Sequence, residues 1–150
     1  MSIDAITLQQ VVNDVCTGML GLNVEPSETV SCDEPDAVSA VIRISGDWNS
    51  LVQVLAPRST AKVIASTMFS MTEDELTEAE IADAVGEIVN MVGGNLKGIV
   101  QGDSSLSLPC VGTMSTDSPF GTAFDGIEVN NLCQGDRLIV RVLETTAQLV

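Results

Sequence analysis

Two pairs of short apolar runs, each joined by a turn signal, limit the folds open to this 150-residue chain. In the first pair, alternate positions from 38 to 44 are apolar, Gly46 to Asn49 form a turn signal, and a second apolar run covers 51–55. In the second pair, 127–132 and 138–142 flank the turn signal at 134–136. Alternation with period two predicts strands, and strands paired around short turns predict antiparallel hairpins.

Three other segments have the spacing of helices. The first carries apolar residues in helical register at Leu8, Val11, Val12, Val15 and Met19. The second opens at Pro57 and continues to about Phe69. The third follows a capping box, in which Thr77 stands three residues before Glu80, and runs to about position 99.

The order of these elements predicts the fold class. A further short strand is expected over Leu106 and Leu108, ending at Pro109, whereas 112–126 has the composition of a loop. The count is about three helices and five or six strands, with the strands mostly in hairpin pairs and helices between the pairs. We therefore expect an α+β fold, with helices packed on one face of a mostly antiparallel sheet, in a single domain over residues 1–150.

The third helix presents two distinct faces when its residues are placed about 100° apart. Its expected core stripe consists of Ile81, Val85, Ile88, Val92, Leu96 and Ile99. The opposite face carries Asp83, Glu87, Asn90, Gly94 and Lys97. Glu87 and Asn90 are three residues apart, so their Cβ atoms are expected about 5–6 Å from each other.

Two interpretations of this polar face are open. A polar face opposite an apolar stripe is what any surface helix carries. However, Asn90 is a poor helix former in mid-helix, and Gly86, Gly93 and Gly94 each cost about 1 kcal/mol relative to alanine. Such glycines are easier to understand if another backbone comes close, and Gly94 would leave room for an incoming protein. The alternative is a helix that simply ends at Gly93 and Gly94.

The amino-acid composition limits the kinds of functional site and partner that this chain can have. The chain has no histidine, which excludes histidine-based acid–base catalysis and histidine metal sites. Its formal net charge is −15, which disfavours nucleic acid and anionic membranes as partners. The four cysteines lack C-x-x-C spacing and are expected to be buried and unbridged. No apolar run approaches the roughly 18 residues of a membrane span, and no signal-peptide pattern opens the chain, so we expect a cytoplasmic protein.

The polar face also resembles a known motif. Asp83-x-x-x-Glu87-x-x-Asn90, followed by Gly94 and by Leu-Ser-Leu-Pro at 106–109, is similar to the signature of the CheC/CheX/FliY phosphatases of bacterial chemotaxis. The single copy of the motif, and the strand pattern before it, resemble CheX most. The resemblance covers about residues 4–112 and, more weakly, the C-terminal strands. It implies a CheC-like fold and one CheX-like phosphatase domain.

The resemblance further implies the reaction and the roles of residues. The substrate would be the aspartyl-phosphate of a CheY-like response regulator, which itself holds a Mg²⁺ ion and a lysine, so this chain would bind no metal or cofactor of its own. Glu87 would pair with that lysine, and Asn90 would orient the attacking water, since a carboxamide both donates and accepts hydrogen bonds. Hydrolysis would then rest on positioning. Asp83 and Gly94 are candidates for partner contact, although Asp83 alone could be a solvated residue.

Other functions compatible with the sequence belong to different classes. CheC-like folds resemble flagellar switch components, so a non-enzymatic module that binds the regulator, or acts as a scaffold, is the main alternative. A small-molecule sensor has less support, because aromatic residues make up only 3% of the chain. The resemblance also implies a homodimer, for which the edge strands of the sheet would be open. The sequence does not identify the cognate regulator.

Overall fold

The computed structural model describes residues 3–28, 32–113 and 126–145, which form one sheet with three α-helices. The sheet has seven strands in the order β1-β6-β7-β3-β2-β4, and β5 also pairs with β2. Its strands are β1 (Val24–Pro26), β2 (Val38–Gly46), β3 (Ser50–Ala56), β4 (Ser104–Leu106), β5 (Cys110–Thr113), β6 (Ile127–Cys133) and β7 (Asp136–Glu144). Every strand pair in the described part of the chain is antiparallel.

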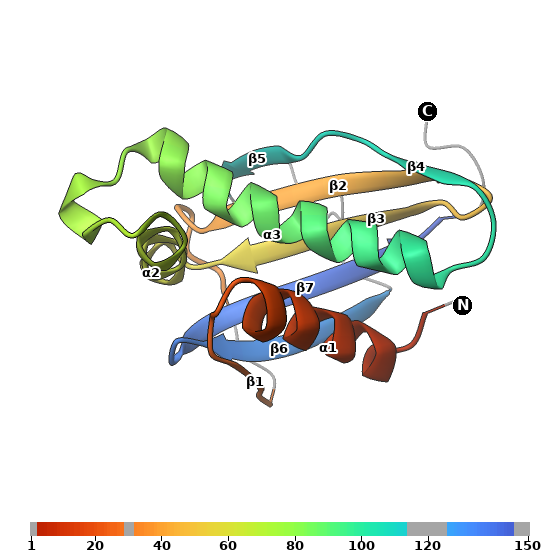
Figure 1. The fold of residues 1–150 in the computed structure, drawn as a ribbon, viewed down its shortest axis with the longest axis horizontal. Coiled ribbons are helices and arrows are strands. Elements are labelled where there is room, and N and C mark those ends of the chain that lie inside the picture. Colours follow the sequence, from red (N-terminus) through yellow and green to blue (C-terminus); the bar gives the residue numbers. More distant parts are fainter. Residues whose placement is uncertain (1–2, 29–31, 114–125, 146–150) are drawn as a thin grey trace.

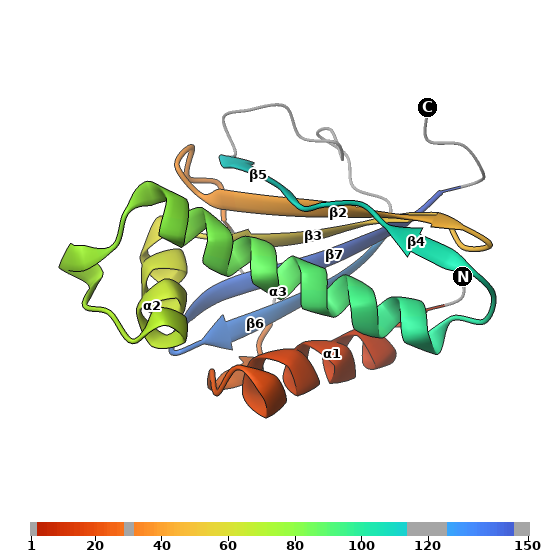
Figure 2. The same cartoon turned by 45° about the horizontal axis from the view of Figure 1, so that its top comes forward.

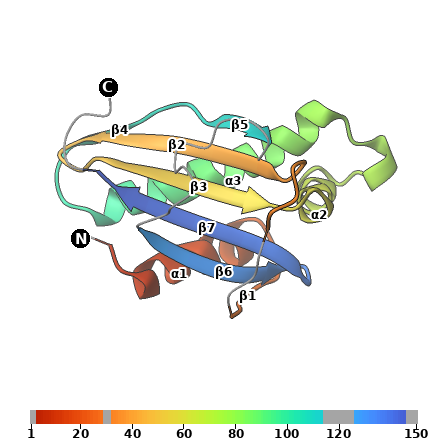
Figure 3. The same ribbon diagram turned by 180° about the vertical axis from the view of Figure 1, so that it is seen from behind.

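The helices lie on one face of this sheet. Helices α1 (Ala5–Asn13) and α3 (Glu78–Ile99) run across it, and α2 (Arg58–Phe69) lies at one end, where it contacts α3 (Figure 1). Seen from behind, the strands lie in front of all three helices (Figure 3). The predicted α+β class, with helices on one face of an antiparallel sheet, is therefore confirmed.

Both predicted hairpins are present. β2 and β3 pair from Val38 opposite Ala56 to Ile44 opposite Ser50. The Asn49 side chain closes the turn, since its Nδ2 donates to the carbonyl oxygen of Gly46 at 3.0 Å. β6 and β7 are joined by Gln134 and Gly135, whose φ angles of 53° and 85° suit the tight turn of a two-residue hairpin.

The core fills the space between the sheet and the helices. Alternate residues of β2 point into it, and they are fully or almost fully buried: Val38, Ala40, Ile42 and Ile44. Every residue of β3 is buried, as expected for a central strand. Each buried valine, leucine or isoleucine contributes about 1.5–3 kcal/mol relative to an exposed one. This core fixes α3, which carries the candidate site, against β2 and β3.

The first helix differs from its prediction at its C-terminal end. Leu8, Val11, Val12 and Val15 are buried as expected, but Met19 is 56% exposed. The chain changes from α-helix to a π-helix, η1, over Asp14–Met19, and the amide of Leu20 donates to the carbonyl of Val15 at 3.0 Å. Because a π-helix has more residues per turn, the α-helical register no longer directs Met19 into the core.

The strand expected over Leu106 and Leu108 is also partly wrong. β4 ends at Leu106, Leu108 is 89% exposed, and a second short strand, β5, begins directly after Pro109. Ser107 keeps the chain attached to β2 at the break, because its amide donates to the carbonyl of Arg43 at 2.9 Å. Proline has no amide hydrogen for the ladder, so the edge of the sheet is interrupted there.

Other expectations from the sequence have mixed outcomes. All four cysteines are free, and Cys16, Cys32 and Cys133 are buried, but Cys110 is exposed because it lies on the edge strand β5. Of the loop expected over 112–126, the first two residues belong to β5, and 114–125 lie outside the described residues. Among the described helices, none has both the length and the apolar character needed to cross a bilayer.

Candidate functional site

Helix α3 is held in place at its first turn. The Thr77 hydroxyl accepts from the amide of Glu80 at 3.2 Å, and the Glu80 carboxylate accepts from the amide of Thr77 at 2.9 Å, which completes the predicted capping box. An ion pair between Arg58 and Glu78 connects the start of α2 to the start of α3. The helix continues to Ile99, so the alternative in which it ends at Gly93 and Gly94 is wrong.

The apolar stripe of α3 is buried except at its end. The residues at 81, 85, 88, 92 and 96 are at most 3% exposed, as predicted. Ile99 has the same helical register but is 51% exposed. The last turn projects beyond its neighbours, since a side chain placed at Gly98 would meet nothing within 4 Å. The buried stripe orients the opposite face of α3 away from the sheet (Figure 2).

The three glycines of α3 have different surroundings. A Cβ at Gly86 would lie 3.2 Å from Cγ2 of Val111, and one at Gly93 would lie 3.1 Å from Cγ2 of Ile42. Both glycines therefore let the helix pack closely on the sheet, against neighbouring side chains rather than backbone. At Gly94 the nearest atom would be Cδ1 of Leu106, at 4.0 Å, so its outward face is open.

A surface hollow of about 570 Å³ lies beside the outward face of α3. From the helix it is lined by Ala82, Asp83, Gly86, Glu87 and Asn90. Three of the four site candidates predicted from the sequence thus lie together at one hollow. Gly94 does not line it, but it is exposed one turn beyond Asn90.

The remaining wall of the hollow comes from other elements. Met68 and Phe69 contribute from the C-terminal end of α2, and Pro109 and Val111 contribute from the start of β5. The sequence pattern did not connect these residues with the site, because they are brought to α3 only by tertiary packing. Pro109, where the sequence predicts a strand to end, instead lies between β4 and β5, and it also lines the hollow.

The polar groups at the hollow are unpaired within the described part of the chain. The side chains of Asp83 and Glu87 are exposed, and neither forms an ion pair there. The two carboxylates are four residues apart on the helix and repel each other mildly. The helix dipole favours acids in the first turn, and both residues lie beyond that turn, so the dipole does not offset this repulsion. Asn90 is half-buried, and its amide has no hydrogen-bond partner among the described residues. These groups are free to bind a partner.

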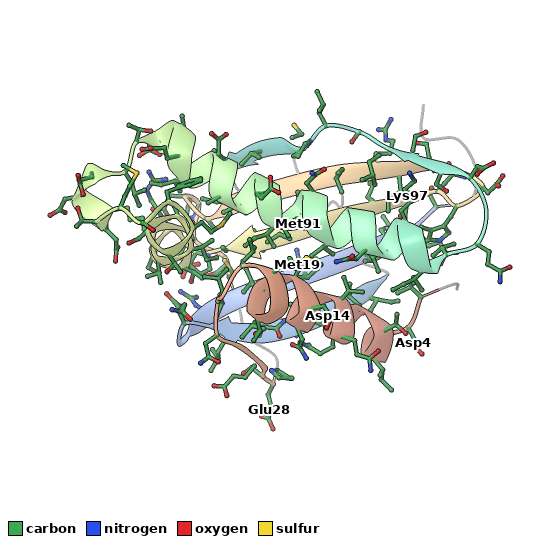
Figure 4. The ribbon with its side chains drawn as sticks, viewed as in Figure 1. Asp4, Asp14, Met19, Glu28, Met91 and Lys97 are labelled. Atoms are coloured by element: carbon green, nitrogen blue, oxygen red, sulfur yellow. The ribbon has the colours of Figure 1, made fainter. Side chains whose placement is uncertain are left out.

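Two labelled residues help to locate the site on α3. Figure 4 shows Lys97 near the C-terminal end of the helix, where it complements the helix dipole. Met91 points from α3 toward the segment that carries Met19, on the flank that faces α1. The described residues contain no cluster of three or more histidine, cysteine, aspartate or glutamate side chains that could hold a metal.

The comparison with protein families decides which family this is. A model described as chemotaxis phosphatase CheX matches residues 38–116, which is more than half of the chain. The chain belongs to the CheX family. The match includes β2, β3, α2 and the whole of α3, so the hollow lies within it. No curated protein shows a significant match to this CheX-family chain.

Solved structures confirm the fold of this CheX-family chain. Chemotaxis protein CheX from Vibrio vulnificus superposes with a TM-score of 0.76 at 20% identity, covering 97% of this chain and 99% of that one. CheX in the CheX–CheY–BeF3–Mg2+ complex from Borrelia burgdorferi gives 0.70 at 16%, covering 96% and 99%. FliY from Thermotoga maritima gives 0.60 at 17%, covering 92% and 84%. At these identities the likeness establishes the fold.

Proposed function

We propose that this chain is a phosphatase that hydrolyses the aspartyl-phosphate of a CheY-like response regulator. The observation that carries the proposal is the neighbouring Glu87 and Asn90 pair, which lines an open hollow on a helix whose opposite stripe is packed against the sheet. Membership of the CheX family supports the reaction class, and the complex of another CheX with CheY supports the partner.

The two side chains would have different roles. Glu87 would bind the active-site lysine of the regulator and fix the docked orientation, as an unpaired, exposed carboxylate can. Asn90 would orient a water in line with the phosphorus–oxygen bond to be broken, with the amide both donating and accepting. Asp83 and Gly94 are proposed as further partner contacts. A rigid helix suits this work, because a small displacement of positioning groups costs much of the rate.

The resident metal of the reaction would belong to the regulator. The BeF3 and Mg2+ in the complex from Borrelia burgdorferi are consistent with a phosphoryl mimic and a metal at the CheY site. We expect this chain to bind no cofactor, to act as a single domain over residues 1–150, and to work in the cytoplasm, where response regulators are phosphorylated.

The direct test follows the loss of phosphate from a CheY-type regulator phosphorylated with acetyl phosphate and Mg²⁺. We expect the protein to accelerate this loss. Asn90→Ala should lower kcat about 100-fold, because it removes the group that positions water. Glu87→Ala should lower kcat/KM about ten-fold or more, because it removes the charge that docks the regulator.

The control and the alternative are tested in the same assay. Asn95→Ala removes an asparagine from the same helix that does not line the hollow, and it should retain the wild-type rate. An active wild type with unchanged Asn90→Ala and Glu87→Ala variants would contradict the assignment of the site. Binding of the regulator with no change in phosphate lifetime would instead support the non-enzymatic module.

A further inference from the structure

The hollow beside Glu87 and Asn90 has an apolar wall that hydrolysis itself does not require. Met68 and Phe69 form one part of this wall, and Pro109 and Val111 form another. Phe69 is 38% exposed, and Leu108, the neighbour of Pro109 in the chain, is 89% exposed. Aromatic side chains that are partly exposed at a concave surface are common anchors of protein interfaces.

The rim of the same hollow is acidic. Asp83 and Glu87 line it, and both of their side chains are exposed. None of the described residues that line the hollow is basic. Of the six basic residues, three form ion pairs with acids outside the hollow: Arg58, Arg137 and Arg141. Lys97 lies near the far end of α3 (Figure 4), and Arg43 and Lys62 are not among the residues that line the hollow. A partner that covers this surface therefore gains if it brings positive charge.

We infer that the hollow is a docking pocket for one apolar side chain of the response regulator, flanked there by a lysine or arginine. The apolar side chain would pack on Phe69 and the Pro109–Val111 wall, and the cation would pair with Asp83. Phe69 thus determines affinity for the regulator, whereas Asn90 acts on its phosphoryl group. The inference rests on the proposed function for the identity of the occupant, the regulator.

Charge argues against a second copy of this chain as the occupant. A second copy carries the same formal charge of −15 and would bring more acid than base to an acidic rim. A regulator with a basic residue beside an apolar one can bind both the acidic rim and the apolar wall of the hollow. Burial beside Phe69 would also exclude water from the Asp83 ion pair, which strengthens its Coulomb attraction against the cost of desolvating the two charges.

The test compares Phe69→Ala with Ile99→Ala. Both variants remove a large, exposed apolar side chain, 38% and 51% exposed in turn, but Ile99 lies at the other end of α3 and does not line the hollow. Phe69→Ala should raise KM for the phosphorylated regulator about ten-fold, with the effect on KM rather than on kcat. Ile99→Ala should keep the wild-type KM. Thermal melts of both variants separate loss of docking from loss of folding.

Salt dependence and direct binding complete the test. For the wild type, kcat/KM should fall as NaCl rises, and Asp83→Asn should flatten that dependence. Affinity for a regulator activated with BeF3 and Mg²⁺ should fall in Phe69→Ala even if hydrolysis is absent, which separates this inference from the proposed reaction. A folded Phe69→Ala variant with wild-type KM and affinity would overturn the docking pocket. A wild-type protein that binds neither the phosphorylated regulator nor the regulator activated with BeF3 and Mg²⁺ would also overturn it.

Discussion

Gly94 and Gly98 are exposed glycines on the same helix, one turn apart, and they separate a contact role from a structural one. Alanine at Gly94 should stabilise the fold by about 0.5–1 kcal/mol, because glycine is the poorer helix former and the nearest neighbour would be 4.0 Å away. If a regulator approaches Gly94 closely, the same methyl group should lower kcat/KM. We therefore expect Gly94→Ala to be more stable and less active, measured by urea unfolding and phosphate release.

Gly98→Ala is the matched control for this prediction. A side chain at Gly98 would meet nothing within 4 Å, and the position is two turns from Asn90, so the variant should keep full activity. Wild-type activity in Gly94→Ala would show that the regulator does not approach this part of α3. Gly86 does not serve as a control, because alanine there must displace Val111.

At the level of single residues, sequence reasoning located the polar half of the site but not the apolar half. Asp83, Glu87 and Asn90 share a face because the helix repeat fixes their directions, and the hollow contains all three. Phe69 and Val111 reach the same hollow from α2 and β5, and no local repeat relates them to α3. The helical register of Ile99 predicts a core position, but register alone does not show where the neighbouring elements end, and Ile99 is 51% exposed.

The next larger unit is α3, whose first turn depends on the capping box. Thr77→Ala removes the hydroxyl that accepts from the amide of Glu80, leaving that donor without its partner. We expect a loss of about 1 kcal/mol in the free energy of unfolding, measured by chemical denaturation. Because Glu87 and Asn90 lie more than two turns inside the helix, kcat at a temperature well below the melting point should change little.

Thr67→Ala is a matched substitution on α2 with the opposite expectation. The Thr67 hydroxyl donates to the carbonyl of Val63 within the helix at 2.9 Å, an interaction that adds little stability. Alanine is also the better helix former, so this variant should be as stable as the wild type or more so. If Thr77→Ala and Thr67→Ala lower the free energy of unfolding equally, the N-cap hydrogen bond of α3 adds no more stability than an ordinary threonine hydroxyl within a helix.

Whether a helix or strand can be predicted from the sequence depends mainly on its length. The hairpins and α3 were predicted because each has several turns or alternations and a recognisable start or turn. β1 and β5 have three and four residues, and β1 contains Pro26, so neither gives a periodic pattern. The sequence does not predict the π-helix after α1, because the helical register changes without a proline or glycine at the point where the π-helix begins.

At the scale of the whole molecule, open sheet edges favour self-association, whereas the net negative charge opposes it. The outer sides of β1, β4 and β5 have no strand partner among the described residues, so another strand can pair there. β1 and β4 have three residues each and β5 has four, which limits the number of hydrogen bonds that such pairing can form. Two copies that approach each other also carry −15 each, and this repulsion is screened as ionic strength rises.

The homodimer that the resemblance to CheX implies should therefore become more stable as salt rises. Light scattering at micromolar concentration and about 0.15 M NaCl should give about twice the chain mass of 15.7 kDa, and lowering the salt should shift the mass toward that of the monomer. Dilution at fixed salt should produce the same shift, because short edges give a modest association constant. A monomer mass at micromolar concentration at every salt concentration would contradict the homodimer. A dimer that is insensitive to salt would instead place the interface away from the acidic surface, for example on an apolar patch.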